Sequence, residues 1–220
     1  MNLPLRRTDI EDLAELGLQF DAAWQVVDHF EKLVTNFFGA PLGVAVDSCT
    51  HGLELCLRLL DPQQLIEVPA HTYLSVPMTL DKLNISYRLI DLHWSEHYQL
   101  RPLPIIDAAT QWRRNSYEAG TFTVISFQFQ KHLAIGRGGM ILLDNQEQWH
   151  QLQCMARDGR DRTLRHDDDN VKMLGFHYHM TPEDAARGIR LFHAIQDQPA
   201  SIRDWSTYTD LRKKDFFANR

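Results

Sequence analysis

The chain has 220 residues, of which 44% are hydrophobic and 24% charged, and its formal net charge is −6. These proportions are those of an ordinary soluble globular protein. A chain of this length buries roughly 70% of its unfolded surface when it folds, so it needs no disulfide bonds for stability. The acidic balance argues against a dedicated nucleic-acid-binding protein, and no run approaches the roughly 20 apolar residues of a membrane span.

The hydrophobic pattern predicts alternating helices and strands. Apolar residues recur at helical spacing from about 22 to 38, and Gly39 and Pro41 follow, which predicts a helix that ends there. Short apolar runs predict strands at 44–46, 65–68, 85–90, 104–106, 122–127 and 140–143. One further helix is expected to run from the turn at Thr50 through Leu60, and another to follow the 65–68 strand and end at about residue 80. Two more are expected over 147–157 and 182–195.

This alternation predicts an α/β fold, with a mostly parallel sheet sandwiched by helices. We expect one domain over residues 1–220, with an N-terminal helical arm at about 1–40 and a short C-terminal helical tail at about 198–220. In such sheets, ligands bind beyond the carboxyl ends of the strands. The polar residues that follow each predicted strand are therefore the first candidates for a site.

Three features at these strand ends suit one ligand. Asp107 follows a buried strand, Lys131 lies in the loop after another, and Ser48-Cys49-Thr50 is a polar turn that opens a helix. Pyridoxal 5'-phosphate (PLP) needs a lysine for its aldehyde and an acid for its ring nitrogen. Its phosphate suits a helix N-terminus, and its ring suits an aromatic neighbour. Taken singly, Asp107 could instead cap a helix and Lys131 could be solvated.

The candidate residues lie in five stretches of the chain. These are Phe30-Glu31 to Phe38-Gly39 with Ser48-Cys49-Thr50; Pro69-Ala70-His71-Thr72-Tyr73; Ile106-Asp107-Ala108-Ala109; Ser126-Phe127-Gln128-Phe129-Gln130-Lys131 with Gly136-Arg137-Gly138-Gly139; and Gly175-Phe176-His177-Tyr178-His179-Met180 with Ala185-Ala186 and Gly188. In this order they resemble the motifs of the DegT/DnrJ/StrS sugar aminotransferases, which are fold type I PLP-dependent enzymes. Five ordered matches are more specific than any one of them.

The resemblance implies catalytic roles for two residues. Lys131 would form the internal aldimine, a Schiff base with PLP, and later move the α-proton as general base. Asp107 would form a salt bridge with the pyridinium nitrogen and keep the ring an electron sink. Tyr73 would stack on the ring.

The resemblance also implies residues that bind the cofactor phosphate. Thr50 and the backbone around His51 would hold it, aided by Ser126. His179 lies in a stretch that, in the family, reaches the cofactor phosphate of a neighbouring subunit. We therefore expect a homodimer with a shared active site.

The chain departs from the family pattern in length. About sixteen residues separate Asp91 from Asp107, where the family has a further strand and helix, and the chain ends soon after the 182–195 helix, where the family continues into a small domain. Cys49 also replaces a glycine of the family motif. The resemblance thus implies a minimal fold type I large domain.

The leading functional hypothesis is an aminotransferase that acts on an amino-acid donor and, as one option, a nucleotide-linked acceptor. The first alternative is a PLP-dependent decarboxylase, lyase or isomerase of an amino acid, which could be attached to a larger molecule such as a phage-modified DNA base. The second is a non-catalytic binding module, which would have no need for both Lys131 and Asp107.

Neither a metal site nor a membrane association is expected. The three cysteines include no Cys-x-x-Cys pair, and His177-x-His179 lacks a third ligand at recognisable spacing. The first residues show no apolar stretch after their two arginines, so no secretory signal is predicted and a cytoplasmic location is expected.

Overall fold

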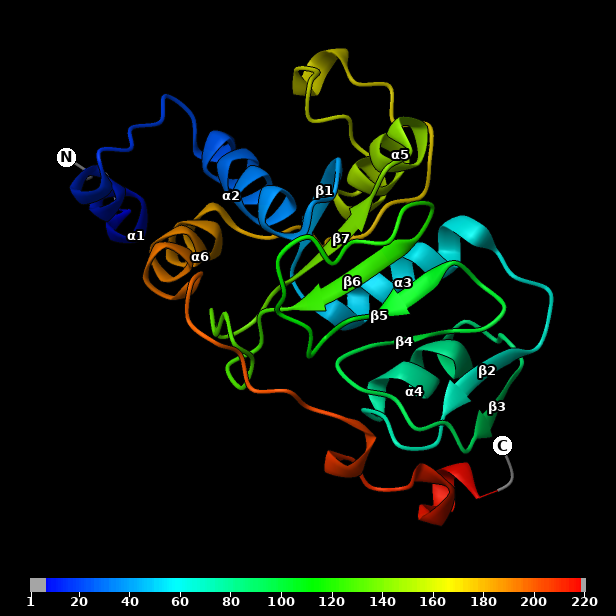
Figure 1. Ribbon diagram of the computed structural model, residues 1–220. Coiled ribbons are helices and arrows are strands. Elements are labelled where there is room, and N and C mark those ends of the chain that lie inside the picture. The colour runs from blue at the N-terminus through cyan, green and yellow to red at the C-terminus, as the bar shows by residue number, and fades with distance from the viewer. Residues whose placement is uncertain (1–6, 219–220) are drawn as a thin grey trace.

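The computed structural model describes residues 7–218, except for the side chain of His166. The ends of the expected single domain, residues 1–6 and 219–220, lie outside the described residues. Figure 1 shows a central sheet with helices on both sides and a long C-terminal segment that runs below it.

The central sheet has five strands in the spatial order β1-β7-β6-β5-β4. Their bounds are β1 Leu42–Val46, β7 Gly139–Leu143, β6 Phe122–Ser126, β5 Ile105–Asp107 and β4 Tyr98–Gln99. Two further strands, β2 Ile66–Pro69 and β3 Tyr87–Ile90, form a separate parallel pair. The predicted α/β class is confirmed, and all six predicted strands are present.

The strand directions differ from the expected mostly parallel sheet. Of the four pairings in the central sheet, only β5 with β6 is parallel, because β7 runs antiparallel to both of its neighbours and β4 runs antiparallel to β5. The β6–β7 connection contains no helix, and an antiparallel pair needs none. Strands β1, β5 and β6 nevertheless run in one direction, so their carboxyl ends share one edge.

Five helices lie close to their predicted positions. They are α2 Ala23–Phe38, α3 Cys49–Leu60, α4 Ser75–Lys82, α5 Gln146–Ala156 and α6 Pro182–Ile195. A single helical turn, α1 Thr8–Glu11, and a 3-10 turn at Asp12–Leu16 precede them. The C-terminal tail holds 3-10 turns at Trp205–Thr207, Leu211–Lys213 and Asp215–Phe217 rather than an α-helix.

The sheet separates two hydrophobic cores. Val44 and Val46 of β1 pack into one core and Ala45 into the other, because successive strand residues point to opposite faces. Helices α3 and α5 contribute to the first core, and α2 and α6 to the second. Helix α2, which was expected in the N-terminal arm, is thus part of the core.

A glycine allows α3 to begin directly beside the sheet. A Cβ at Gly139, the first residue of β7, would lie 2.6 Å from the amide nitrogen of Cys49 and 2.8 Å from the carbonyl carbon of Ser48. Gly139 is paired with Ser126, the last residue of β6. The absent side chain therefore brings the N-terminus of α3 against the carboxyl end of β6.

Phe30 tests the core between α2 and the sheet. Its side chain is fully buried and packs edge-to-face on Phe127, with ring centroids 5.3 Å apart. We expect Phe30→Ala to lower the free energy of unfolding in urea by about 3–5 kcal/mol through lost burial and a new cavity. Leu174→Ala, at a side chain 73% exposed, should change it by less than about 0.5 kcal/mol. Equal losses in the two variants would contradict this assignment of the core.

Candidate active site

The carboxyl edge of the sheet borders a cavity of about 740 Å³. Five of the seven predicted site residues line it, although they come from four separate parts of the chain: Thr50, Tyr73, Asp107, Ser126 and Lys131. The other two, His51 and His179, do not line it. The structure therefore brings most of the predicted constellation to one place.

Asp107 is the buried acid of this cavity. It ends β5, is 6% exposed, and accepts hydrogen bonds from the Tyr98 hydroxyl at 2.6 Å and from the Ala109 amide at 3.0 Å. Burial raises the pKa of Asp107, while these two hydrogen bonds and the charge of Lys131 act in the opposite direction. No described basic side chain forms an ion pair with Asp107.

Sequence reasoning missed Tyr98, which holds that carboxylate. Tyr98 lies in β4, opposite Asp107 in the strand register, and its hydroxyl also shares a hydrogen bond with Thr72. Strand β4 has only two residues, which is too short for a periodic pattern. It lies in the short stretch where the family pattern is interrupted.

Lys131 is the half-buried amine of the cavity. It lies in the loop between β6 and β7, and its amide donates to the Gln128 carbonyl at 2.8 Å. Burial lowers the pKa of Lys131, Asp107 opposes that shift, and Arg203 adds to it. A lowered pKa increases the fraction of neutral amine, which is the nucleophilic form.

The N-terminus of α3 supplies an anion-binding end. Ser48 is the N-cap, and its Oγ accepts from the His51 amide at 3.1 Å. The Thr50 hydroxyl lines the cavity and bonds with Ser75 Oγ at 2.9 Å. First-turn amides have no acceptor within the helix, and the helix dipole favours a negative charge there.

His51 is engaged away from the cavity. Its ring stacks on Tyr178 with centroids 3.7 Å apart, and its Nδ1 is 2.6 Å from Asp47 Oδ1. Its amide is already used by the Ser48 cap. The expected contribution of His51 to the phosphate site is therefore not supported by its position.

His179 does not line the cavity. Its backbone is bridged to Val46, and its ring packs edge-on against Trp24 at 5.3 Å. The third group that the sequence lacked is Asp158, since ligand-type atoms of Asp158, His177 and His179 lie within 4.8 Å of one another. Asp158 and His177 are exposed and hydrogen-bonded to each other at 2.9 Å, as ordinary surface pairs are.

Tyr73 and Ser126 complete the predicted set. Tyr73 is 59% exposed at the cavity, so one face of its ring is available to a ligand. Ser126 ends β6, and its Oγ accepts from the Gln128 amide at 3.4 Å.

These residues fit PLP. A buried carboxylate with only neutral hydrogen-bond donors among the described residues suits a protonated ring nitrogen. A lysine lies on the same cavity, and a helix N-terminus lies beside it. The cavity volume is within the 300–1,000 Å³ that is common for small-molecule sites.

An α/β domain with a lysine and an aspartate at the carboxyl edge of its sheet has the architecture of fold type I PLP-dependent enzymes. The sequence model of the DegT/DnrJ/EryC1/StrS aminotransferase family matches residues 12–114 and 108–212. The chain belongs to this family. The predicted recognition is confirmed, and the enzyme class and PLP are those of the family.

The most similar proteins include one curated sequence and several solved structures. An uncharacterized protein of Methanocaldococcus jannaschii is 25% identical over 73% of this chain and 55% of its own length. AtS13 from Actinomadura melliaura has a TM-score of 0.73 at 22% identity, covering 89% of this chain and 66% of that one. The sugar aminotransferase CalS13 from Micromonospora echinospora has a TM-score of 0.67 at 17% identity, covering 90% and 67%. The chain thus spans about half to two thirds of these proteins.

No described helix combines the length and the apolar character that crossing a bilayer requires.

Asp107→Asn tests the electrostatics of the site. Burial raises the pKa of Asp107, so at pH values above the ordinary pKa of an aspartate the folded chain keeps a proton that the unfolded chain has released. The contribution of Asp107 to the free energy of unfolding therefore falls as the pH rises through that window. In cofactor-free protein at pH 7, we expect Asp107→Asn to raise the free energy of unfolding by on the order of 1 kcal/mol, since it removes a buried charge. The gain should shrink toward pH 4. Asp91→Asn, at a side chain 68% exposed, is the control and should show no such trend. A loss of stability in Asp107→Asn at neutral pH would contradict the analysis.

Proposed function

We propose that the protein binds PLP in the 740 Å³ cavity and transfers an amino group from an amino-acid donor to a carbonyl acceptor. The observation that carries this proposal is the placement of Lys131 and Asp107 on one cavity from the adjacent parallel strands β5 and β6. When bound, the cofactor supplies an aldehyde that takes up the amine and a ring that accepts the electron pair left on the substrate carbon.

Lys131 has two tasks in this proposal. Its Nζ, whose pKa burial lowers, would hold the cofactor covalently. When it is not bound to the cofactor, the same Nζ would accept and carry the proton that leaves the substrate carbon. A lowered amine pKa favours both tasks.

Asp107 would keep the ring nitrogen protonated. Tyr98 donates to Asp107 Oδ2, and the Ala109 amide donates to Oδ1, so the carboxylate is held in one orientation. Thr50 and the first turn of α3 would bind the phosphate, with Ser126 beside them. Tyr73 would cover one face of the ring. Within one chain, His51 and His179 have no contact with this cavity.

A nucleotide-linked sugar is the acceptor that we propose. One related structure, DesI, holds its TDP-sugar product, with a TM-score of 0.63 and 16% identity, and CalS13 is a sugar aminotransferase. The cavity has room for more than the cofactor's ring, and its lining includes both acidic and basic side chains.

We propose a homodimer with a shared active site. Large apolar side chains are exposed on and beside the cavity: Tyr73, Leu74, Met78 and Phe129. Exposed apolar groups of this size are typical of protein–protein contacts. His179, which does not line the cavity of its own chain, remains a prediction for the contact between two copies.

Lys131→Ala tests the covalent link. Wild-type protein mixed with PLP should retain visible absorbance after gel filtration, and Lys131→Ala should lose that absorbance. The control Lys172→Ala, at an exposed site, should retain it. Adding glutamate to the wild type should convert the bound cofactor to its amine form, seen as loss of that band. Retained absorbance in Lys131→Ala would overturn the assignment of the lysine. Release of carbon dioxide from an amino acid, with no spectral response to glutamate, would favour a decarboxylase.

The dimer is tested by light scattering. We expect the PLP-loaded protein to have twice the mass of one chain, and Met78→Asp, which places a charge at an exposed apolar side chain outside the cavity lining, to shift it toward a monomer. Arg190→Gln on the outer face of α6 should leave the mass unchanged. A wild-type monomer that still holds PLP would contradict a shared site.

A further inference from the structure

Asp158, His177 and His179 form a cluster of metal-ligand side chains outside the cavity. One ligand-type atom from each of the three residues lies within 4.8 Å of the other two. Among the described side chains, no other set of three His, Cys, Asp or Glu groups lies this close together. None of the three lines the 740 Å³ cavity, so the cluster is a separate feature of the molecule.

Backbone pairing holds the three residues beside one another. Arg157 is bridged to His177, and the Asp158 amide donates to the Phe176 carbonyl at 3.1 Å. His179 is bridged on its other side to strand β1. Because His177 and His179 are two residues apart in an extended segment, their side chains lie on one face, with ring centroids 4.5 Å apart. The backbone therefore sets the spacing of the cluster.

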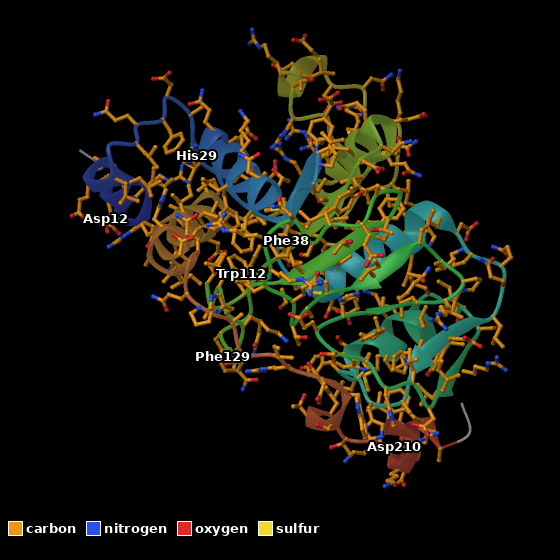
Figure 2. The ribbon with its side chains drawn as sticks, in the orientation of Figure 1. Asp12, His29, Phe38, Trp112, Phe129 and Asp210 are labelled. Atoms are coloured by element: carbon orange, nitrogen blue, oxygen red, sulfur yellow. The ribbon has the colours of Figure 1, made fainter. Side chains whose placement is uncertain are left out.

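The cluster lies where the two ends of the loop 159–176 meet. The ends approach so closely that a Cβ at Gly175 would overlap the Gly159 amide nitrogen. Asp158 has a φ of 60°, in the left-handed region that aspartate and asparagine adopt more readily than most residues. In Figure 2 the loop projects at the top of the molecule, at the opposite end from Asp210 of the tail.

His179 distinguishes this cluster from an ordinary surface pair. A histidine beside an aspartate, as His177 is beside Asp158 at 2.9 Å, is common on protein surfaces. The Nδ1 of His179, however, is buried and has no hydrogen-bond partner within the described structure, which is unfavourable. Burial and the charges of His177 and Arg157 lower the pKa of His179, which favours the neutral ring that binds a metal.

The three side chains match the ligand preference of zinc and related ions. Two imidazoles and a carboxylate suit Zn²⁺ and its first-row neighbours, whereas Mg²⁺ and Ca²⁺ prefer oxygen ligands alone. With bonds of about 2.1 Å, tetrahedral ligand atoms lie roughly 3.4 Å apart, closer than the present 4.8 Å limit. The side chains of His177 and Asp158 are 78% and 52% exposed, so both have room to turn toward an ion. The charges of Arg157 and Asp158 act on His179 in opposite directions, so the arginine does not oppose a cation without compensation.

We propose that Asp158, His177 and His179 bind one divalent first-row transition-metal ion per chain, with Zn²⁺ as its representative. A water molecule would complete the coordination. The ion would join the two ends of the loop 159–176 and so close it as a ring. The sequence did not predict this site, because its third ligand lies 19 residues before His177. The proposal goes beyond the proposed function and does not depend on PLP.

Calorimetric titration of untagged, PLP-free protein tests the site. We expect Zn²⁺ to bind at one ion per chain and Mg²⁺ not to bind. Two variants remove a ligand: Asp158→Asn, in which asparagine also accepts the left-handed backbone, and His177→Ala, at an exposed side chain. Each should weaken Zn²⁺ binding by at least about 10- to 100-fold, the loss seen when a group that only supports a ligand is removed.

His93→Ala is the matched control. His93 is exposed and lies 4.0 Å from Asp91, and within the described side chains no third ligand is grouped with them. This variant should bind Zn²⁺ as wild type does. Co²⁺ gives a second measurement, because its visible bands report ligand geometry: wild type should show them, and His177→Ala should not. Zn²⁺ should also raise the unfolding temperature of wild type but not that of Asp158→Asn.

The results separate this site from the proposed function. Absence of Zn²⁺ binding to wild type, or unchanged binding in both Asp158→Asn and His177→Ala, would overturn the metal site, whatever the outcome with PLP. One ion per two chains would overturn a site that is complete within one chain. Failure of Lys131 to hold PLP would end the proposed function, and the titrations of cofactor-free protein would still decide the metal site.

Discussion

The site depends on the parallel pairing of β5 with β6. In this register Asp107 lies opposite Val124, and Ser126 ends β6 just beyond it. Because the two strands end at the same edge, an acid at the end of one and a lysine in the loop after the other line one cavity. Antiparallel pairing of the same two strands would send them to opposite edges of the sheet.

Close backbone packing completes that edge. The N-terminus of α3 lies against Gly139, where no Cβ fits, and the antiparallel strand β7 carries that glycine to the end of β6. Helix α3 starts directly after the carboxyl end of β1, at the same edge as the ends of β5 and β6, and Gly139 lets its N-terminus pack closely there.

Two short segments far apart in the sequence finish the cavity. Tyr98 in β4 donates to the Asp107 carboxylate, and Arg203 in the tail lines the same cavity as Lys131. The segments are joined to each other, since the Glu96 amide bonds to the Arg203 carbonyl and Ser95 is bridged to Asp204. These contacts thus fix the tail that carries Arg203 beside the segment that leads into β4.

The sequence by itself determined the α/β class, six strands, five helices and the pair Lys131 and Asp107, because periodic burial and residue types at strand ends are local properties of the chain. Strand direction, the role of Tyr98 and the placement of Arg203 were decided by the tertiary structure. A two-residue strand has no period, and an arginine in a tail has no neighbours in sequence that show where it lies. His51 lies at a correctly predicted helix start, but its ring stacks on Tyr178 and its amide donates to the Ser48 cap, so its place at the phosphate stays a prediction. Which way a side chain points, and what it meets there, depends on elements distant in sequence.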